Sequence, residues 1–155
     1  MTRCRGTRLL WLDPTPARIV GQAMTIKCET EQPGAFRQIL RAEAHTFRSD
    51  LAATAGGQDS APGPHDYFDA SLAACKALTA HVYAKGHGIA LDRVDVHVER
   101  DNSRERQGTY VLKVKLEFYG ALTDAEKAKL HDVVSRCPIH KLMTSTKVEV
   151  VSEPP

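Results

Sequence analysis

The 155-residue chain has no strong excess of charge of either sign and no long apolar run. Lys and Arg together number 21 against 19 Asp and Glu, a formal net charge of +2 when histidine is neutral. This small excess, without a basic run or interleaved aromatic residues, argues against nucleic-acid binding. No apolar stretch approaches the roughly 18 residues that a membrane-spanning helix needs. The N-terminal apolar run ends at Asp13 and Pro14, too early for a secretory signal, so we expect a cytoplasmic protein without a nucleic-acid or membrane partner.

Cysteine is scarce and forms no C-x-x-C pair; the four cysteines are Cys4, Cys28, Cys75 and Cys137. Their spacing argues against structural zinc, and a reducing cytoplasm argues against structural disulfides. Cys137 and His140 have a plausible metal-ligand spacing, but the chain offers no second clean ligand pair. We therefore expect no metal and no cofactor. Any disulfide in this chain would serve chemistry rather than architecture.

A long helix is predicted over residues 66–86. Phe68, Leu72, Cys75 and Val82 recur with the helical period, which predicts one apolar stripe with Cys75 in its middle, on the buried face. Small residues flank Cys75, so another backbone could pack close to this helix. Residues 1–23 show no such periodicity and Met24 offers an alternative start, so we expect an extension at 1–23 and a single domain at 24–155.

The rest of the chain reads as strands and short helices. Apolar and polar residues alternate over 93–100 and 109–120, the period of a half-buried antiparallel pair. Residues 36–50 are expected to form a further pair of strands, and residues 146–153 a closing strand. Residues 122–136 are expected to form a helix, because Thr123 and Glu126 make a capping box. These elements predict an α+β domain in which a long central helix packs on antiparallel sheets.

The stretch "SRCPIHKLM" places a cysteine directly before a proline. Pro138 suits the first position of a helix, which makes Cys137 the N-cap. Free N–H groups and the positive helix end would then favour a thiolate, helped by Lys141 and by a protonated His140. On the residues alone, Cys137 is either a reactive thiol or a small apolar cap, and Cys75 is either reactive or a small core residue.

Two motifs together resemble the OsmC/Ohr family of thiol peroxidases, in its general OsmC-like branch. They are "GPHDYFDASLAACKALT", which carries Cys75, and "SRCPIHKLM", which carries Cys137. The resemblance runs from about residue 36 to the end of the chain. It implies an intertwined homodimer with both cysteines at the interface. It also implies that Cys75 attacks an organic hydroperoxide and becomes a sulfenic acid, that Cys137 closes a disulfide with it, and that an external dithiol reduces this disulfide.

The chain departs from the family at the residues that tune the thiolate. Better-studied members have a glutamate ten residues before the helix cysteine, paired with an arginine, but His65 stands at that position. Asp66, the next residue, could serve if the helix begins after it or if a partner chain uses it.

The arginine of that pair could be any one of Arg37, Arg41 and Arg48, of which we favour Arg48 in "HTFRSD". The missing glutamate keeps a second function open. The chain could be a non-enzymatic dimer that binds a small apolar ligand or senses oxidant.

Overall fold

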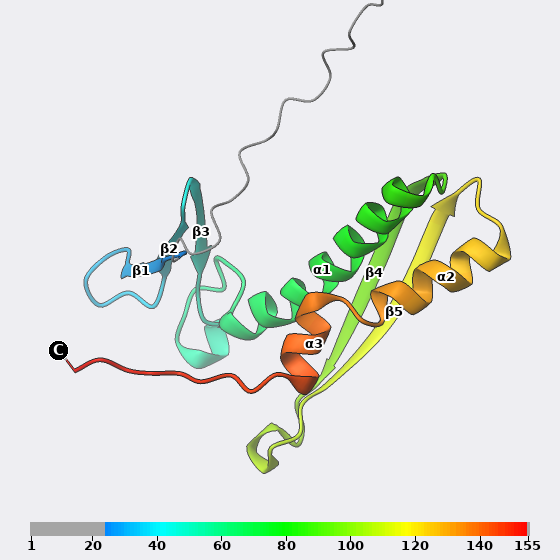
Figure 1. The fold of residues 1–155 in the computed structure, drawn as a ribbon. Coiled ribbons are helices and arrows are strands. Elements are labelled where there is room, and N and C mark those ends of the chain that lie inside the picture. The colour runs from blue at the N-terminus through cyan, green and yellow to red at the C-terminus, as the bar shows by residue number, and fades with distance from the viewer. Residues whose placement is uncertain (1–23, 155) are drawn as a thin grey trace, which may run out of the picture.

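A computed structural model describes residues 24–154. Its strands form two antiparallel sheets (Figure 1). The first, in the order β1-β2-β3, comprises β1 (Ile26–Thr30), β2 (Gln38–Ala42) and β3 (His45–Ser49), and the second comprises β4 (Leu91–Asp101) and β5 (Val111–Gly120). The helices are α1 (Pro64–His87), α2 (Asp124–Val134) and α3 (Pro138–Ser145), with 3-10 turns η1 (Ala53–Ala55) and η2 (Glu105–Gln107). The predicted α+β class is therefore confirmed, whereas the extension predicted at 1–23 lies outside the described residues.

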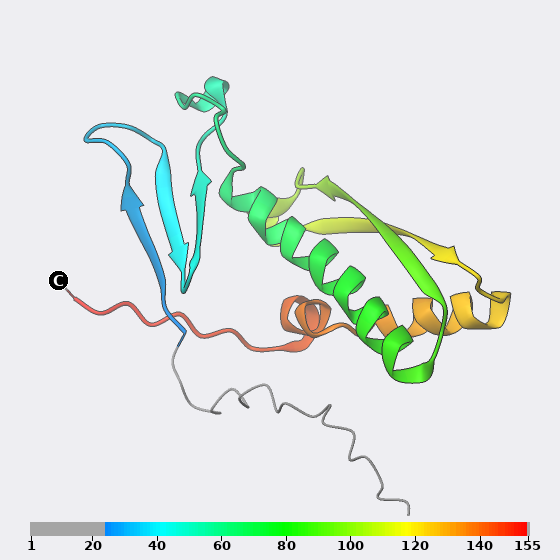
Figure 2. The same ribbon diagram turned by 90° about the horizontal axis from the view of Figure 1, so that it is seen from above.

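The core lies where α1 and α2 pack against the β4–β5 hairpin (Figure 2). Its centre consists of buried residues from the two helices: Ala80, Ala84, Leu130 and Val134. Around them pack half-buried strand residues such as Val94 and Phe118, which lie opposite each other in the hairpin. The alternation predicted for these strands is confirmed, because Val94, Val96 and Val98 are half-buried while His97 and Glu99 are exposed. The capping box is also present, with the Glu126 N–H donating to Thr123 Oγ1 at 3.2 Å.

The face of α1 that the chain buries includes only part of the predicted stripe: Leu72 is 4% exposed, as predicted, but its neighbours on the stripe are not buried. Phe68, Leu78 and Val82 are 47%, 64% and 73% exposed. The face toward the hairpin instead presents Ala80 and Ala84, whose small side chains allow close approach of the two backbones. Phe68, Leu78 and Val82 lie on a flank that residues 24–154 leave largely exposed. Cys75 is half-buried.

The β1–β3 sheet stands apart from the body of the molecule (Figures 1 and 2). It joins the start of α1 through Tyr67, whose hydroxyl donates to the Arg48 carbonyl and whose ring lies 5.3 Å from that of Phe47. The strand pair predicted over 36–50 is confirmed as β2 and β3, and β1 is an additional strand.

The closing strand predicted over 146–153 is wrong for the single chain. Within residues 24–154 this segment runs on from α3 without a strand partner (Figure 1), and a strand needs the hydrogen bonds of a partner edge. None of the helices within residues 24–154 is both long enough and apolar enough to cross a membrane.

Candidate thiol site

The first turn of α3 brings Cys75 and Cys137 together. Cys75 lies in the middle of α1, and its Sγ accepts a hydrogen bond from the Ile139 N–H at 3.5 Å. Cys137 is the N-cap of α3 with Pro138 at the first helical position, as predicted, and its Sγ accepts from the His140 N–H at 3.4 Å. These N–H groups have no partner inside the helix, so the sulfurs satisfy them. Both cysteines are free thiols, and Cys75 lies close enough to raise the pKa of the Cys137 thiol.

Burial, rather than the helix end, dominates the acidity of Cys137. Its side chain is 0% exposed. Burial raises the pKa of the Cys137 thiol, and the neighbouring Cys75 thiol raises it further. The His140 N–H and the charge of Lys76 act in the opposite direction and are outweighed. The helix end therefore acts on Cys137 in the predicted direction but is outweighed by burial, and Lys141, which was expected to assist it, is exposed to solvent.

Lys76 is a site residue that sequence reasoning missed. It follows Cys75 on α1, is only 4% exposed, and donates from Nζ to the Val134 carbonyl at 2.9 Å. The same carbonyl accepts the Cys137 N–H at 3.4 Å. The signal in the sequence is a charged residue beside a cysteine, four residues after Leu72 and four before Ala80, which are buried on the same face of α1.

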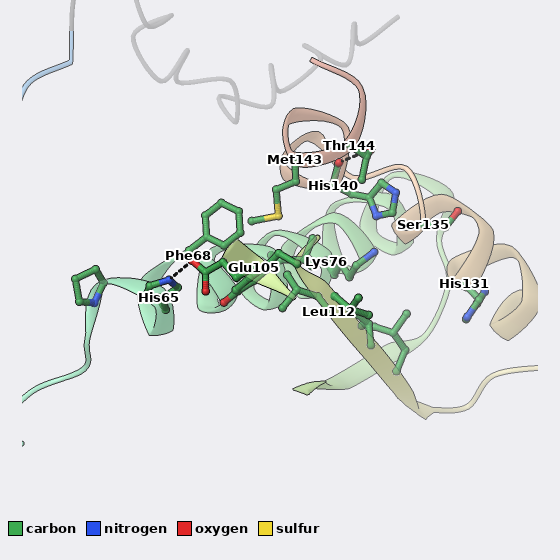
Figure 3. Close-up of a pocket in the computed structure, with 16 residues that line it drawn as sticks. His65, Phe68, Lys76, Glu105, Leu112, His131, Ser135, His140, Met143 and Thr144 are labelled. Carbon is green, nitrogen blue, oxygen red and sulfur yellow. Dashed lines mark hydrogen bonds and ion pairs between the residues drawn. The ribbon is translucent and has the colours of Figure 1, made fainter. Parts of the chain in front are cut away.

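A cleft of about 880 Å³ lies close to the cysteines: neither sulfur lines it, but Lys76, which follows Cys75, and His140, which contacts the Cys137 sulfur, do. Apolar residues of α1, β5 and α3 supply much of its lining, among them Leu72, Val114 and Met143. Lys76 and His140 reach the same cleft from opposite helices (Figure 3). An apolar molecule in this cleft would lie next to Lys76, which follows Cys75, and next to His140, whose N–H donates to the Cys137 sulfur.

Arg100 ties the helix that carries Cys75 to the hairpin. Its Nε lies 2.5 Å from Asp69 Oδ2 and its Nη2 lies 2.6 Å from Asp66 Oδ1. Tyr110 donates to the other oxygen of Asp69 at 3.0 Å. Asp69 is buried, so these contacts supply the partners that its carboxylate needs. The sequence held a signal for this cluster, because Arg100 continues the inward register of Val94, Val96 and Val98.

The sequence profile of the OsmC-like protein family matches residues 57–152. The chain belongs to the OsmC-like family. The fold is similar to that of a putative osmotic stress induced and detoxification response protein from Psychrobacter arcticus 273-4, with a TM-score of 0.67 at 18% identity over 82% of this chain and 93% of the other. The structure of an OsmC-like protein from Mycoplasma pneumoniae is similar with a TM-score of 0.64 and 18% identity; the match covers 81% of this chain and 89% of the other. The structure of an organic hydroperoxide resistance protein OsmC from Legionella pneumophila is similar with a TM-score of 0.58 and 19% identity; the match covers 79% of this chain and 90% of the other. No protein of curated function matches the sequence closely.

The OsmC-like chain does not bring its candidate arginines to the cysteines. Arg48 pairs with Glu31 at 3.0 Å, and Arg37 pairs with the same carboxylate. These two guanidinium groups lower the pKa of Glu31, Arg48 most strongly. Arg41 pairs with Glu29. In the part of the chain that the structure describes, all three arginines therefore belong to the β1–β3 sheet and its glutamates.

His65, at the position of the family glutamate, and Asp66, the next residue, contact different partners. His65 Nε2 lies 2.9 Å from Glu105 Oε1, at one end of the cleft (Figure 3). Asp66 lies in the first turn of α1, where it accepts the Gly63 N–H at 2.8 Å and pairs with Arg100. The Arg100 guanidinium, followed by the Gly63 N–H, lowers the pKa of Asp66. Within residues 24–154, no cluster of three or more His, Cys, Asp or Glu side chains could hold a metal ion.

Proposed function

We propose that the protein is a thiol-dependent peroxidase that reduces organic hydroperoxides. The observation that carries this proposal is the meeting of two free thiols, Cys75 from α1 and Cys137 from α3, at one helix end beside an apolar cleft. Free thiols suit the reducing cytoplasm, where we place the protein. The name of the similar Legionella protein, an organic hydroperoxide resistance protein, agrees with this chemistry.

The reaction has two steps, and burial distinguishes the cysteines. In the first, the Cys75 thiolate attacks the peroxide, the O–O bond breaks, and a sulfenic acid and an alkoxide form; the alkoxide takes a proton and leaves as an alcohol. In the second, Cys137 displaces hydroxide from the Cys75 sulfenic acid and closes a disulfide, which an external dithiol reduces. Cys75 is half-buried whereas Cys137 is fully buried with a raised pKa, which supports Cys75 as the group that meets the peroxide.

Thiol titration tests this function. One equivalent of cumene hydroperoxide should remove two thiols per chain within seconds, because both cysteines are oxidised in one turnover. The measurement is a count of free thiols before and after the addition, with hydrogen peroxide as a comparison substrate. A slow loss over many minutes would favour the alternative of a non-enzymatic protein that binds a small apolar ligand or senses oxidant. That alternative is supported by His65, which stands where better-studied members have glutamate, and by the apolar cleft.

We propose that the working form is a homodimer. Three features are left exposed by the part of the chain that the structure describes: the α1 flank of Phe68, Leu78 and Val82, the detached β1–β3 sheet, and the unpaired segment 146–153. A second copy packed in an intertwined manner would cover all three. In that arrangement β3 of one chain could bring Arg48 to the cysteine pair of the other, and Asp66, held by Arg100, would position the helix that carries Cys75.

The wild-type protein should therefore sediment as a dimer at micromolar concentration. Val82→Glu places a charge on the α1 flank and should weaken the dimer at least about tenfold, because an unpaired charge would be buried there. Ala128→Glu is the matched control, since it makes the same charge change at an exposed position of α2. Analytical ultracentrifugation measures both. A folded wild-type monomer at micromolar concentration would contradict the dimer.

A further inference from the structure

Lys76 carries a buried positive charge that no carboxylate of the described chain balances. Its side chain is 4% exposed, and its hydrogen-bond partner is the neutral Val134 carbonyl at 2.9 Å. Lys76 takes part in none of the ion pairs between described residues. Burying an ammonium group without an anion costs free energy. A group that forms an anion nearby would recover part of that cost.

Cys137 is a group able to do so, and the Lys76 charge lowers the pKa of its thiol. The Val134 carbonyl accepts both the Lys76 ammonium and the Cys137 N–H, so the charge lies beside the backbone of that cysteine. Of the other titratable groups around Cys137, Cys75 contacts it from α1 and His131 of α2 lines the same cleft as Lys76. On α3, His140 donates its N–H to the sulfur and Lys141 is exposed. Among these residues around Cys137, Lys76 is the buried cation.

We propose that Lys76 is a positioning residue for disulfide closure, in which its ammonium group stabilises the Cys137 thiolate that attacks the Cys75 sulfenic acid. This inference rests on the proposed peroxidase function and assigns Lys76 to its second step. The Cys137 sulfur supplies the electron pair of the new S–S bond, the S–O bond of Cys75 breaks, and the departing hydroxide takes up a proton to become water. Burial raises the pKa of the Cys137 thiol and so disfavours its thiolate, and the charge of Lys76 lowers this pKa and offsets part of that effect.

The experiment separates the two steps. In Lys76→Met, disulfide closure at pH 7 should slow about tenfold relative to wild type, as expected for loss of a cation beside a thiolate. The closure rate is taken from the decay of the sulfenic acid and is therefore separate from the rate at which that acid forms. The deficit should shrink as the pH rises, because bulk hydroxide then deprotonates Cys137. Rapid acid quench, alkylation and mass spectrometry follow the sulfenic acid and the disulfide. Lys76→Arg should recover closure, and Lys141→Met, an exposed lysine of α3, is the matched control.

A second measurement needs no peroxide. In a chain whose other three cysteines are serine, the thiolate absorbance of Cys137 is followed against pH, with and without Lys76→Met. The substitution should raise the pKa of the Cys137 thiol by about 1. An unchanged pKa overturns the inference whether or not the protein proves to be a peroxidase. If disulfide closure in Lys76→Met is as fast as in wild type, or is slowed equally at every pH, the proposed role of Lys76 is overturned as well. If wild type consumes no peroxide, the proposed function fails by itself while the pKa comparison still decides the role of Lys76.

Discussion

Cys75→Ser should reduce peroxide consumption to the rate of the buffer, whereas Cys137→Ser should still consume one equivalent and stop. The first variant lacks the sulfur that we propose as the attacking group on the O–O bond. The second keeps it but cannot close the disulfide, so a sulfenic acid should persist on Cys75 and be trapped by dimedone. Stopped-flow measurement of peroxide and mass spectrometry of the trapped adduct give the two readouts. Cys28→Ser is the control, because Cys28 is exposed on β1 and should leave both steps unchanged.

The opposite pattern would reverse the roles of the sulfurs. If Cys75→Ser kept the fast reaction and Cys137→Ser lost it, the N-cap position of Cys137 would outweigh its burial. The structure makes this reversal unfavourable in two ways. Cys137 is fully buried, so a peroxide must displace its surroundings to reach the sulfur, and burial raises the pKa of its thiol. Cys75 is half-buried and accepts an N–H from the same positive helix end.

Local sequence signals predicted the elements that carry the cysteines. The proline at the first position of α3 predicted Cys137 as its N-cap, and the Thr123–Glu126 pair predicted the start of α2. The period of two in β4 and β5 predicted which of their side chains face inward. These signals are local because each depends on backbone groups within one turn or one strand pair.

The errors concern packing between elements, which local signals do not determine. Apolar residues of α1 predicted a buried stripe, but close packing on the hairpin favours the alanine face, and the flank that carries Val82 is left uncovered. Arg100 and Lys76 were missed because each looks like an ordinary surface charge until the hairpin and α2 cover it. Segment 146–153 has the composition of a strand, but a strand also needs a partner edge. In a dimer, a second chain would supply one.

The cluster around Arg100 determines how firmly α1 lies on the hairpin. Arg100 reaches from β4 to two carboxylates in the first two turns of α1, and Tyr110, which immediately precedes β5, closes the cluster on Asp69. The pKa of Tyr110 is raised, first by its burial and then by its hydrogen bond to Asp69, so the hydroxyl stays a donor at neutral pH. Cys75 lies beyond these turns on the same helix. Loss of the cluster should therefore loosen the helix that holds the reacting sulfur.

Arg100→Met should lower the free energy of unfolding by roughly 3 kcal/mol, because it leaves the buried Asp69 carboxylate without its cation. Urea denaturation followed by circular dichroism gives the value. Arg93→Met is the matched control on the same strand: Arg93 is exposed and its ion pair with Asp95 at 3.2 Å should contribute less than about 1 kcal/mol. Adding Asp69→Asn to Arg100→Met should recover part of the loss, since a neutral amide costs less to bury than a carboxylate.

The same comparison has a defined pH dependence. Arg100 lowers the pKa of Asp66 below its ordinary value of 3.8, so its stabilising effect is complete above that value and is lost as the pH falls through the lower folded-state pKa. The gap in stability between wild type and Arg100→Met should thus be constant from pH 5 to about 7 and narrow below 3.8. A gap that stayed constant down to pH 3 would mean that Arg100 stabilises the fold by packing of its methylene groups rather than by charge. A loss no larger than that of Arg93→Met would show that the Asp69 carboxylate is hydrated, and that the cluster does not hold α1 in place.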